Sequence, residues 1–499
     1  MPITRVLVAN RGEIALRIIR ACHEEGLEAV AVYSDADRLS PAVRSADYAV
    51  GLGPAPASES YLRMEKLIEA ARQSGAQAIH PGYGFLAERA GFARMVEAAG
   101  LIFVGPPSAA IQAMGDKTEA RRRMIAAGVP VVPGASAAIE NAAGAATLAR
   151  ELGYPVLVKA AAGGGGRGMR MVEREEQLAP ALESAGSEAL KAFGDAAVYL
   201  EKYIVRPRHV EIQVLADHER TVHLGERECS IQRRHQKLVE ESPSVAVSPE
   251  LRERMGAAAV AAARAVDYRG AGTCEFLLGS DASFYFLEMN TRIQVEHPVT
   301  ELVYGVDLVR EQLRIARGLP MTLPEERLVP DGWAIECRIT SEDPAHGFLP
   351  STGRITYLRP PGGPGVRWDA GVEVGDEVSL YYDSMVAKLI VHAPDRPAAI
   401  ERMRRALREL VVMGIATNQG FHTRLFDDRA YRNGEVDIQF LERRPDLIHL
   451  VPDASDDLPL VAAAALLEDA HRHGSGSAVA PADQRRSGWL DAARRDGLR

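Results

Sequence analysis

Two apolar segments in the middle of the chain, 273–278 and 284–290, carry side chains that can bind a cation. Glu275 lies in the first segment, and Glu288 and Asn290 lie in the second. The turn-forming sequence Gly-Ser-Asp-Ala-Ser joins them, which predicts a β-hairpin. Because side chains alternate along a strand, Glu288 and Asn290 point to one side, where Glu275 meets them from the paired strand. These oxygen ligands suit Mg²⁺ or Mn²⁺. The alternative is an ordinary half-exposed hairpin.

A row of polar residues follows the second segment. If the chain stays extended, Arg292, Gln294 and Glu296 lie on the same face as Glu288 and Asn290. Such a row next to a metal suits an anionic co-substrate held by Arg292, with Glu296 as general base. A solvated strand at the edge of a sheet is the competing interpretation.

A glycine-rich loop, 163–168, joins two strand-like segments, 156–159 and 169–172. No helix follows the loop, which argues against a dinucleotide site, and Met169 stands where a P-loop requires lysine. The pattern therefore favours a flap whose backbone N–H groups close over nucleotide phosphates. Lys159, expected to be buried in its strand, needs an anionic partner, either a carboxylate or a phosphate. A flexible hairpin without a ligand is the plainer alternative.

A densely charged segment, 226–237, reads Glu-Arg-Glu-Cys-Ser-Ile-Gln-Arg-Arg-His-Gln-Lys. Its donors suit phosphate or a second anion. Read alone, the segment predicts a charged surface loop.

The elements that position these residues begin with a strand and helix alternation. Strand-like runs occur at 6–9, 29–33, 76–80 and 102–104, with an amphipathic helix at 14–22 after the first of them. This rhythm predicts a parallel sheet covered by helices.

Changes in composition divide the chain into domains. We expect an N-terminal α/β domain at 1–114 and the chemistry-bearing domain at 115–330, with a separable lobe at about 131–203. A mixed α/β domain is expected at 331–450. The Asp-, Ala-, Ser- and Gly-rich tail at 451–499 is expected to be partly ordered.

Composition restricts the class of protein. A chain of 499 residues with 46% hydrophobic content is expected to fold into several domains. The net charge of -9 and the lack of a lysine or arginine block argue against nucleic-acid and membrane-surface binding.

The cysteines have neither zinc-site nor disulfide spacing, and a strand beginning near Arg5 leaves no room for a secretion leader. We expect a cytoplasmic protein whose cysteines are reduced; they are Cys22, Cys229, Cys274 and Cys337.

Five strings together resemble the biotin carboxylase family, and the similarity extends from Thr4 to Leu450. They are Ala-Asn-Arg-Gly-Glu-Ile-Ala at 9–15, His-Pro-Gly-Tyr-Gly-Phe-Leu at 80–86, Gln-Arg-Arg-His-Gln-Lys at 232–237, Glu-Met-Asn-Thr-Arg-Ile-Gln-Val-Glu-His-Pro at 288–298, and Glu-Cys-Arg-Ile at 336–339.

The resemblance implies a fold and a reaction. The fold is an ATP-grasp domain with a mobile lid, preceded by a parallel α/β domain and followed by a mixed α/β biotin carboxylase C-terminal domain. In the implied reaction, bicarbonate attacks the γ-phosphate of ATP to give carboxyphosphate, and its CO₂ carboxylates biotin on a separate carrier. The implied partners are a biotin carboxyl carrier protein and the carboxyltransferase of an acetyl-CoA, propionyl-CoA or pyruvate carboxylase. A homodimer is expected.

The resemblance also implies roles for particular residues. The nucleotide would be bound by Lys117, Lys159, Gly165, Gly166, Glu201, Lys202, Tyr203, Ile204, His209, Gln232 and His235. The metal ions would be bound by Glu275, Glu288 and Asn290. Bicarbonate would be held, beside the base Glu296, by Lys237, Arg292 and the backbone of Val295. The biotin enolate would be stabilised by Arg338, with Tyr83 nearby.

Two other functions remain as alternatives. An ATP-grasp ligase that feeds carbamoyl phosphate or amide synthesis would share the metal and phosphate residues. It would lack the polar row 292–296 and the string around Arg338. A catalytically silent scaffold subunit should have lost a metal or bicarbonate residue, and none is missing here.

The lysines predict where the biotin is attached. Biotin is carried on a lysine that normally has methionine on both sides. None of the seven lysines of this chain has such neighbours, and none follows Lys388. We therefore expect the biotin to be carried by another chain.

Overall fold

The computed structural model describes most of the chain: residues 2–135, 139, 142–160, 169–193, 197–324, 329–448, 462–463 and 466. The chain divides into two units, Met1–His449 and Leu450–Arg499. The predicted tail at 451–499 lies almost entirely outside the described residues. No helix in the described part is long and apolar enough to span a membrane.

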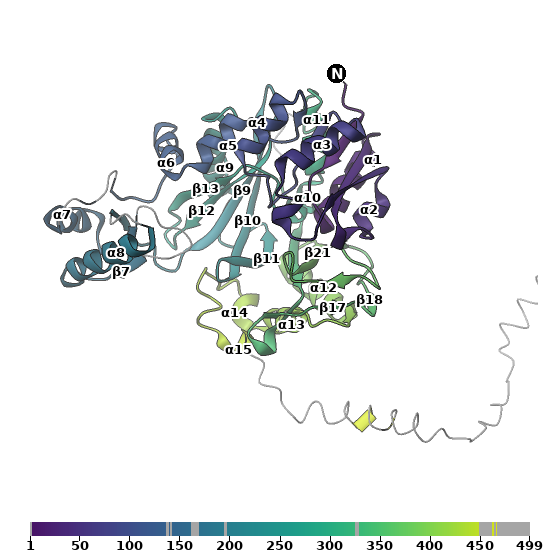
Figure 1. Cartoon of the computed structure of the whole chain (residues 1–499). Helices are drawn as coiled ribbons and strands as arrows, with labels where there is room; N and C mark the ends of the chain where they lie inside the picture. Colours follow the sequence, from purple (N-terminus) through teal and green to yellow (C-terminus); the bar gives the residue numbers. More distant parts are fainter. Residues whose placement is uncertain are drawn as a thin grey trace, which may run out of the picture. The chain divides into compact units, whose positions relative to one another are not determined.

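The N-terminal sheet has five parallel strands in the order β3-β2-β1-β4-β5. They are β1 (Arg5–Val8), β2 (Glu28–Ser34), β3 (Tyr48–Gly53), β4 (Ala78–His80) and β5 (Ile102–Phe103). The helices that alternate with them are α1 (Gly12–Glu24), α2 (Pro41–Ser45), α3 (Met64–Ser74) and α4 (Ala90–Ala98). The predicted parallel sheet covered by helices is confirmed (Figure 1).

The first helix shows why this alternation forms. On α1, Ile14, Ile18 and Cys22 recur at intervals of four residues and are buried. Such spacing places them on one face of a helix, which can then cover the sheet. They share a hydrophobic core with Val6 and Val8 of β1.

A second, antiparallel sheet of eight strands follows in the order β13-β12-β9-β10-β11-β14-β21-β19. Its strands are β9 (Arg208–Ala216), β10 (Thr221–Arg233), β11 (Gln236–Ser242), β12 (Gly270–Leu278), β13 (Phe284–Asn290), β14 (Trp333–Thr340), β19 (Val366–Ala370) and β21 (Met385–Ala393). Strand β11 pairs with β14, with Val239 opposite Cys337. The middle and C-terminal regions therefore build one sheet between them.

The two faces of this sheet differ in chemistry. On β9, Val210, Ile212 and Val214 belong to the same core as Met255 of α9 (Pro249–Arg264). The intervening Glu211 is fully buried on the other face. That face is covered by α10 (His297–Tyr304) and α11 (Leu308–Ala316). The polar face thus lies between the sheet and α10.

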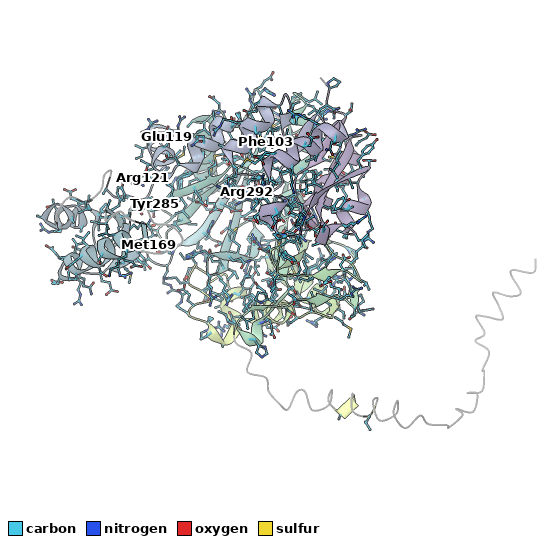
Figure 2. All side chains as sticks on the ribbon, in the orientation of Figure 1. Phe103, Glu119, Arg121, Met169, Tyr285 and Arg292 are labelled. Atoms are coloured by element: carbon cyan, nitrogen blue, oxygen red, sulfur yellow. The ribbon has the colours of Figure 1, made fainter. Side chains whose placement is uncertain are left out.

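A third sheet, in the order β7-β6-β8, lies in the expected lobe. Its antiparallel strands are β6 (Val156–Ala160), β7 (Met169–Val172) and β8 (Val198–Lys202), and its helices are α7 (Ala142–Leu152) and α8 (Leu178–Phe193). Val156 and Val158 of β6 share a core with Leu200 of β8 that is separate from the other cores. The predicted strands at 156–159 and 169–172 are confirmed, and they pair in antiparallel register. Figure 1 labels β7 and Figure 2 labels Met169 in this lobe.

The remaining elements connect or cap these sheets. The helices are α5 (Ser108–Gly115), α6 (Lys117–Ala126), α12 (Arg396–Glu409), α13 (Gln419–Asp427), α14 (Arg429–Arg432) and α15 (Pro445–Ile448). Short paired strands are β15 (Glu342–Asp343) with β16 (Leu349–Pro350), β17 (Gly353–Arg354) with β20 (Glu377–Val378), and β18 (Tyr357–Arg359) with β22 (Val411–Met413).

Candidate active site

The charged segment 226–237 is a β-hairpin whose residues 226–231 are buried and whose turn is exposed, so the prediction of a surface loop is wrong for most of the segment. Strands β10 and β11 enclose a turn at Arg234 and His235, whose φ angles are 50° and 66°. Arg227 and its neighbours are buried. The segment tolerates burial because its partners come from other strands, which composition within the segment does not reveal.

Arg227 forms the centre of this buried network. Its Nε donates a hydrogen bond to Glu211 of β9. Its two terminal nitrogens donate at 2.7–3.0 Å to Gln213, Thr273, Gln294 and Thr300. A fully buried guanidinium is tolerated when its N–H groups are satisfied in this way. Arg227 therefore fixes the carboxylate of Glu211 from behind.

Lys237 lies among three carboxylates. Its Nζ donates to Glu211 Oε2 at 2.6 Å, to Glu296 Oε1 at 2.7 Å and to Glu275 Oε1 at 3.0 Å. Burial opposes the charged form, but Glu211, Glu296 and Glu275 outweigh it and raise the pKa of Lys237 well above its usual value. Lys237 is therefore a fixed positive charge in the middle of the polar face.

The predicted cation ligands meet on the β12–β13 hairpin. Glu275 stands opposite Glu288, and Asn290 Nδ2 donates to Glu275 Oε1 at 2.9 Å. His209 of β9 adds an imidazole, with Nε2 3.2 Å from Glu275 Oε2. Two carboxylates and an amide oxygen form the hard donor set that Mg²⁺ and Mn²⁺ prefer.

The electrostatics of this hairpin fit a bound cation. Burial opposes ionisation of Glu275, but Lys237 and His209 outweigh it and hold the pKa of Glu275 well below its usual value. Burial and the charge of Glu275 raise the pKa of Glu288. Two facing carboxylates that repel each other gain from a divalent ion between them. The residues present therefore fit the metal.

A second group of possible ligand atoms, on His209, Glu211 and Glu275, lies within 4.8 Å. Both oxygens of Glu211 already accept hydrogen bonds from Arg227 and Lys237. The Glu288 carboxylate, by contrast, accepts no hydrogen bond from a described residue. The set around Glu288 is therefore the better candidate.

The polar row after β13 is not extended, and that prediction is wrong. The strand ends at Asn290, and Glu296 is the N-cap residue of α10, which has Pro298 in its first turn. Ile293 turns inward into the core. A proline in the first turn suits the start of a helix, so α10 begins where a continuing strand was expected.

The bend nevertheless brings Arg292 and Gln294 into contact with the proposed cation ligands. Arg292 Nη2 donates to Asn290 Oδ1 at 2.9 Å, and Gln294 Nε2 donates to Glu275 Oε1 at 3.0 Å. Arg292 Nε also lies 3.2 Å from Glu88 Oε2. Figure 2 labels Arg292 in the main body, away from the lobe that carries Met169.

Glu296 links Lys237 to Arg338 of β14. Arg338 Nη2 donates to Glu296 Oε2 at 2.9 Å, while its Nε donates to Glu240 Oε1 at 2.6 Å. Burial opposes ionisation of Glu296, but Lys237 and Arg338 outweigh it and hold its pKa well below its usual value. The carboxylate is therefore ionised and flanked by two cations.

Tyr83 is tied to the start of α1. Asn10 Nδ2 donates to the carbonyl oxygens of Pro81 at 2.8 Å and Tyr83 at 2.7 Å, and the Tyr83 hydroxyl donates to Glu13. The Ala-Asn-Arg-Gly-Glu string thus holds the loop that presents Tyr83.

Lys388 connects this loop to Val295. Its fully buried ammonium lies 3.4 Å from Glu13 and donates to the Val295 carbonyl at 2.8 Å. The backbone predicted to hold an anion is therefore positioned by a buried cation from β21.

The expected nucleotide residues are more dispersed. Lys117 begins α6 and its charge acts on Glu288. Gln232 is paired with Lys237 across the β10–β11 hairpin, and His235 lies at the exposed hairpin turn. Gly165 and Gly166 lie outside the described residues.

Lys159 and the expected hinge lie on the lobe sheet. The ammonium of Lys159 pairs with Glu201 of β8, and its side chain is 35% exposed. Its predicted burial is wrong because it alternates with the buried Val158. Lys202 Nζ donates to the Gly153 carbonyl at 2.6 Å. The hinge continues from β8 through Tyr203 and Ile204. In the described residues, therefore, the contact partner of Lys159 belongs to the lobe and not to the polar face.

Sequence reasoning missed Glu211 and Glu240, and it placed Arg227 in a surface loop. A signal for Glu211 was present in His-Val-Glu-Ile-Gln-Val at 209–214, where polar residues alternate with apolar ones in a strand. Alternation of this kind in a buried strand indicates that the polar face of the strand is covered by another element of the protein.

Comparisons with known proteins decide the family. Family models match the biotin carboxylase N-terminal domain at 2–111, the carbamoyl-phosphate synthase L chain ATP-binding domain at 116–324, and the biotin carboxylase C-terminal domain at 336–443. Biotin carboxylase 1 of Bacillus subtilis is 53% identical over 442 residues, covering 88% of this chain and 98% of that protein. The chain belongs to the biotin carboxylase family.

Solved structures of biotin carboxylases share its fold. A biotin carboxylase complex with β-γ-ATP from Campylobacter jejuni is 47% identical, with a TM-score of 0.81 over 88% of this chain and 99% of that one. The biotin carboxylase domain dimer of Hydrogenobacter thermophilus 2-oxoglutarate carboxylase, solved with MgADP and bicarbonate, is 46% identical, with a TM-score of 0.81 over 90% and 100%.

Membership of the family confirms the resemblance and the three-part α/β fold class predicted from the sequence. This biotin carboxylase family member is an ATP-dependent ligase with biotin carboxylase function. The geometry described above can therefore be assigned to steps of that reaction.

Proposed function

We propose that this site uses ATP and bicarbonate to carboxylate a biotin carried outside these 499 residues. The observation that carries the assignment is Glu296, whose two oxygens contact Lys237 and Arg338. An anionic substrate can displace the Glu296 carboxylate from one of these cations. The freed carboxylate can then take up a proton. The facing Glu275 and Glu288 lie on the same polar face.

The nucleotide and metal come first. We assign Mg²⁺ to Glu275, Glu288 and Asn290, where it would neutralise charge on the phosphates of ATP. The Mg-nucleotide and ATP-analogue complexes of the relatives support this assignment. Lys117 lies close enough for its charge to act on Glu288. Lys159, Gly165, Gly166 and the hinge at 201–204 would close over the nucleotide from the lobe.

Bicarbonate would bind between Lys237, Arg292 and the backbone of Val295. When it engages Lys237, that ammonium neutralises Glu296 less, so the pKa of Glu296 rises from its depressed value and the carboxylate becomes a better base. Glu296 then takes the hydroxyl proton of bicarbonate as a bicarbonate oxygen attacks the γ-phosphorus. The bond to ADP breaks, and carboxyphosphate forms.

Biotin would enter beside Arg338 and Tyr83. Carboxyphosphate would break down to CO₂ and phosphate. The released phosphate would take the proton of a ureido nitrogen of biotin, and that nitrogen would attack the CO₂. The ureido oxygen gains negative charge in this step, and Arg338 can donate hydrogen bonds to it. Arg338 is already held by Glu240 and Glu296, so its orientation needs little adjustment.

We keep the predicted domain divisions at 1–114, 115–330 and 331–450, with the lid at 131–203, as proposals. The separate core of the lobe supports the lid. A homodimer, a carboxyltransferase partner and a cytoplasmic location are proposed with them. The dimer of the Hydrogenobacter domain supports the first of these.

The direct test is ADP release measured with and without bicarbonate, free biotin and Mg²⁺. We expect release to need Mg²⁺ and bicarbonate, and biotin to increase it. ADP release that is indifferent to bicarbonate would contradict the proposal and favour another ATP-grasp ligase.

We predict that ATP reduces hydrogen exchange in the described parts of 131–203. The lid gains phosphate partners only when it closes, so the nucleotide shifts the population toward the closed state. Exchange would be measured with and without a nonhydrolysable nucleotide, with β1 to β5 as the internal control. Equal exchange in both samples would contradict a lid.

We also predict that no biotin becomes attached to this chain. None of its seven lysines lies between two methionines. The chain would be expressed with an active biotin ligase and analysed by mass spectrometry, with a known carrier protein as the positive control. A mass increase equal to one biotin on this chain would overturn the separate-carrier proposal.

A further inference from the structure

Two glutamates face each other beneath Arg338. Glu240 of β11 and Glu336 of β14 are opposite in the antiparallel register, and both are fully buried. Side chains opposite in such a pair have Cβ atoms about 5 Å apart. Within the described residues, Glu240 Oε2 and both carboxylate oxygens of Glu336 have no hydrogen-bond partner. Three buried carboxylate oxygens thus lie at one place without a donor.

The charges at this place do not balance if both glutamates are ionised. Arg338 follows Glu336 by two residues, so both lie on one face of β14. Its guanidinium already contacts Glu240 and Glu296. An ionised Glu336 would be a third buried anion next to a single guanidinium. Two adjacent carboxylates in such surroundings hold one proton between them.

The contacts show which glutamate holds the proton. Glu240 accepts from Arg338 Nε at 2.6 Å, as an anion does, whereas Glu336 accepts from no described residue. Burial raises the pKa of Glu240 to about 7 and raises that of Glu336 well above its usual value. The anion is therefore Glu240 and the neutral acid is Glu336.

Groups from every neighbouring element surround Glu336. They are Glu240 of β11, Arg338 of β14, Lys388 of β21, Glu296 at the start of α10, and Tyr83 after β4. The ammonium of Lys388 is engaged by the Val295 carbonyl at 2.8 Å and by Glu13 at 3.4 Å. Lys388 and Arg338 favour an ionised Glu336, but burial and the charges of Glu240 and Glu296 outweigh them and raise the pKa of Glu336.

We propose that Glu240 and Glu336 are a proton-sharing pair that positions Arg338. The anionic Glu240 fixes the guanidinium through Nε and Nη2, Nη2 also contacts Glu296, and the neutral Glu336 leaves Nη1 to the substrate. The proposal rests on the function assigned above to Arg338. Glu336 is neutral below its raised pKa and ionises as the pH rises through it. The resulting anion competes for Arg338, so biotin carboxylation slows at alkaline pH.

The test is the pH profile of biotin-dependent turnover in the full chain. Glu336→Gln fixes position 336 in a neutral form and is expected to remove the alkaline fall. Its rate relative to wild type should rise about tenfold for each pH unit above the wild-type midpoint, as for one titrating group. If the pH–rate profiles of the wild type and of Glu336→Gln coincide at alkaline pH, the proposal is overturned.

Glu241→Gln is the matched control. Glu241 is a buried neighbour on β11, but its carboxylate pairs with Arg396 and Trp333. The Glu241→Gln variant is expected to keep the fall in biotin-dependent turnover that the wild type shows at alkaline pH. If Glu241→Gln and Glu336→Gln lose this fall equally, the effect is a nonspecific weakening of β11, and the proposal is overturned.

Glu240→Gln tests the positioning role. It is expected to lower the turnover number for biotin carboxylation about tenfold or more while changing KM for ATP less than about twofold. A wild-type turnover number, or an equal loss in ATP affinity, would argue against positioning.

Infrared spectroscopy of the wild-type chain tests the neutral acid without relying on activity. A protonated carboxyl band should disappear with the same midpoint as the alkaline fall in rate, and Glu336→Gln should lack it. Different midpoints in the wild type would overturn the proposal even if the variant does not fold. If the band behaves as expected but Arg338→Ala carboxylates biotin normally, the assigned function of Arg338 fails and the neutral acid stands.

Discussion

Replacing Glu288 with glutamine is expected to lower the turnover number for ATP cleavage about a thousandfold, which corresponds to about 4 kcal/mol of transition-state stabilisation. The variant keeps the shape of the side chain and removes one of the two facing charges on the β12–β13 hairpin. The fold should persist because glutamine has nearly the same size and shape as the glutamate that it replaces.

Mg²⁺-dependent ATP cleavage and thermal unfolding would be measured together. The control is Glu377→Gln, which removes a carboxylate from the exposed surface of β20. We expect the control to behave as the wild type in both measurements. A folded Glu288→Gln variant with wild-type, metal-dependent cleavage would remove this residue from the metal site.

Replacing Arg338 with alanine is expected to slow biotin carboxylation about a hundredfold or more, because the loss of one oxyanion donor costs roughly 3 kcal/mol. ATP binding should be affected little, because the described contacts of the Arg338 side chain are with Glu240 and Glu296. The measurement compares the biotin-dependent rate with the affinity for ATP.

Arg338→Lys provides a graded control. Lysine keeps the charge but not the fork of donors that contacts both glutamates, so its rate should lie between those of the wild type and the alanine variant. A biotin-dependent rate that is unchanged in the alanine variant would refute the assigned role.

The sequence predicted the site best where the geometry is local. Glu275, Glu288 and Asn290 lie on one hairpin with a short turn, so strand alternation alone brings them together. Lys159 shows the limit of the same rule. Apolar neighbours suggested a buried lysine, but alternation puts it on the other side of β6 from Val158.

The sequence failed where burial depends on distant partners. Arg227 looks like a surface residue among charged neighbours, yet its bonds run to Thr273, Gln294 and Thr300, far along the chain. The row ending at Glu296 was expected to be extended, and it is not. A helix start, not an extended strand, delivers Glu296 to its partners.

The shared eight-stranded sheet has a consequence for how the enzyme is made. Strand β14 supplies Arg338 and pairs with β11, which supplies Glu240. While the ribosome has delivered only the first 330 residues, β11 is an edge with free backbone groups that can pair with another nascent chain. The nucleotide side of the site can form at that stage, but the biotin side cannot. A fragment cut at this boundary is therefore expected to aggregate, and synthesis must pass β21 before the catalytic face is closed.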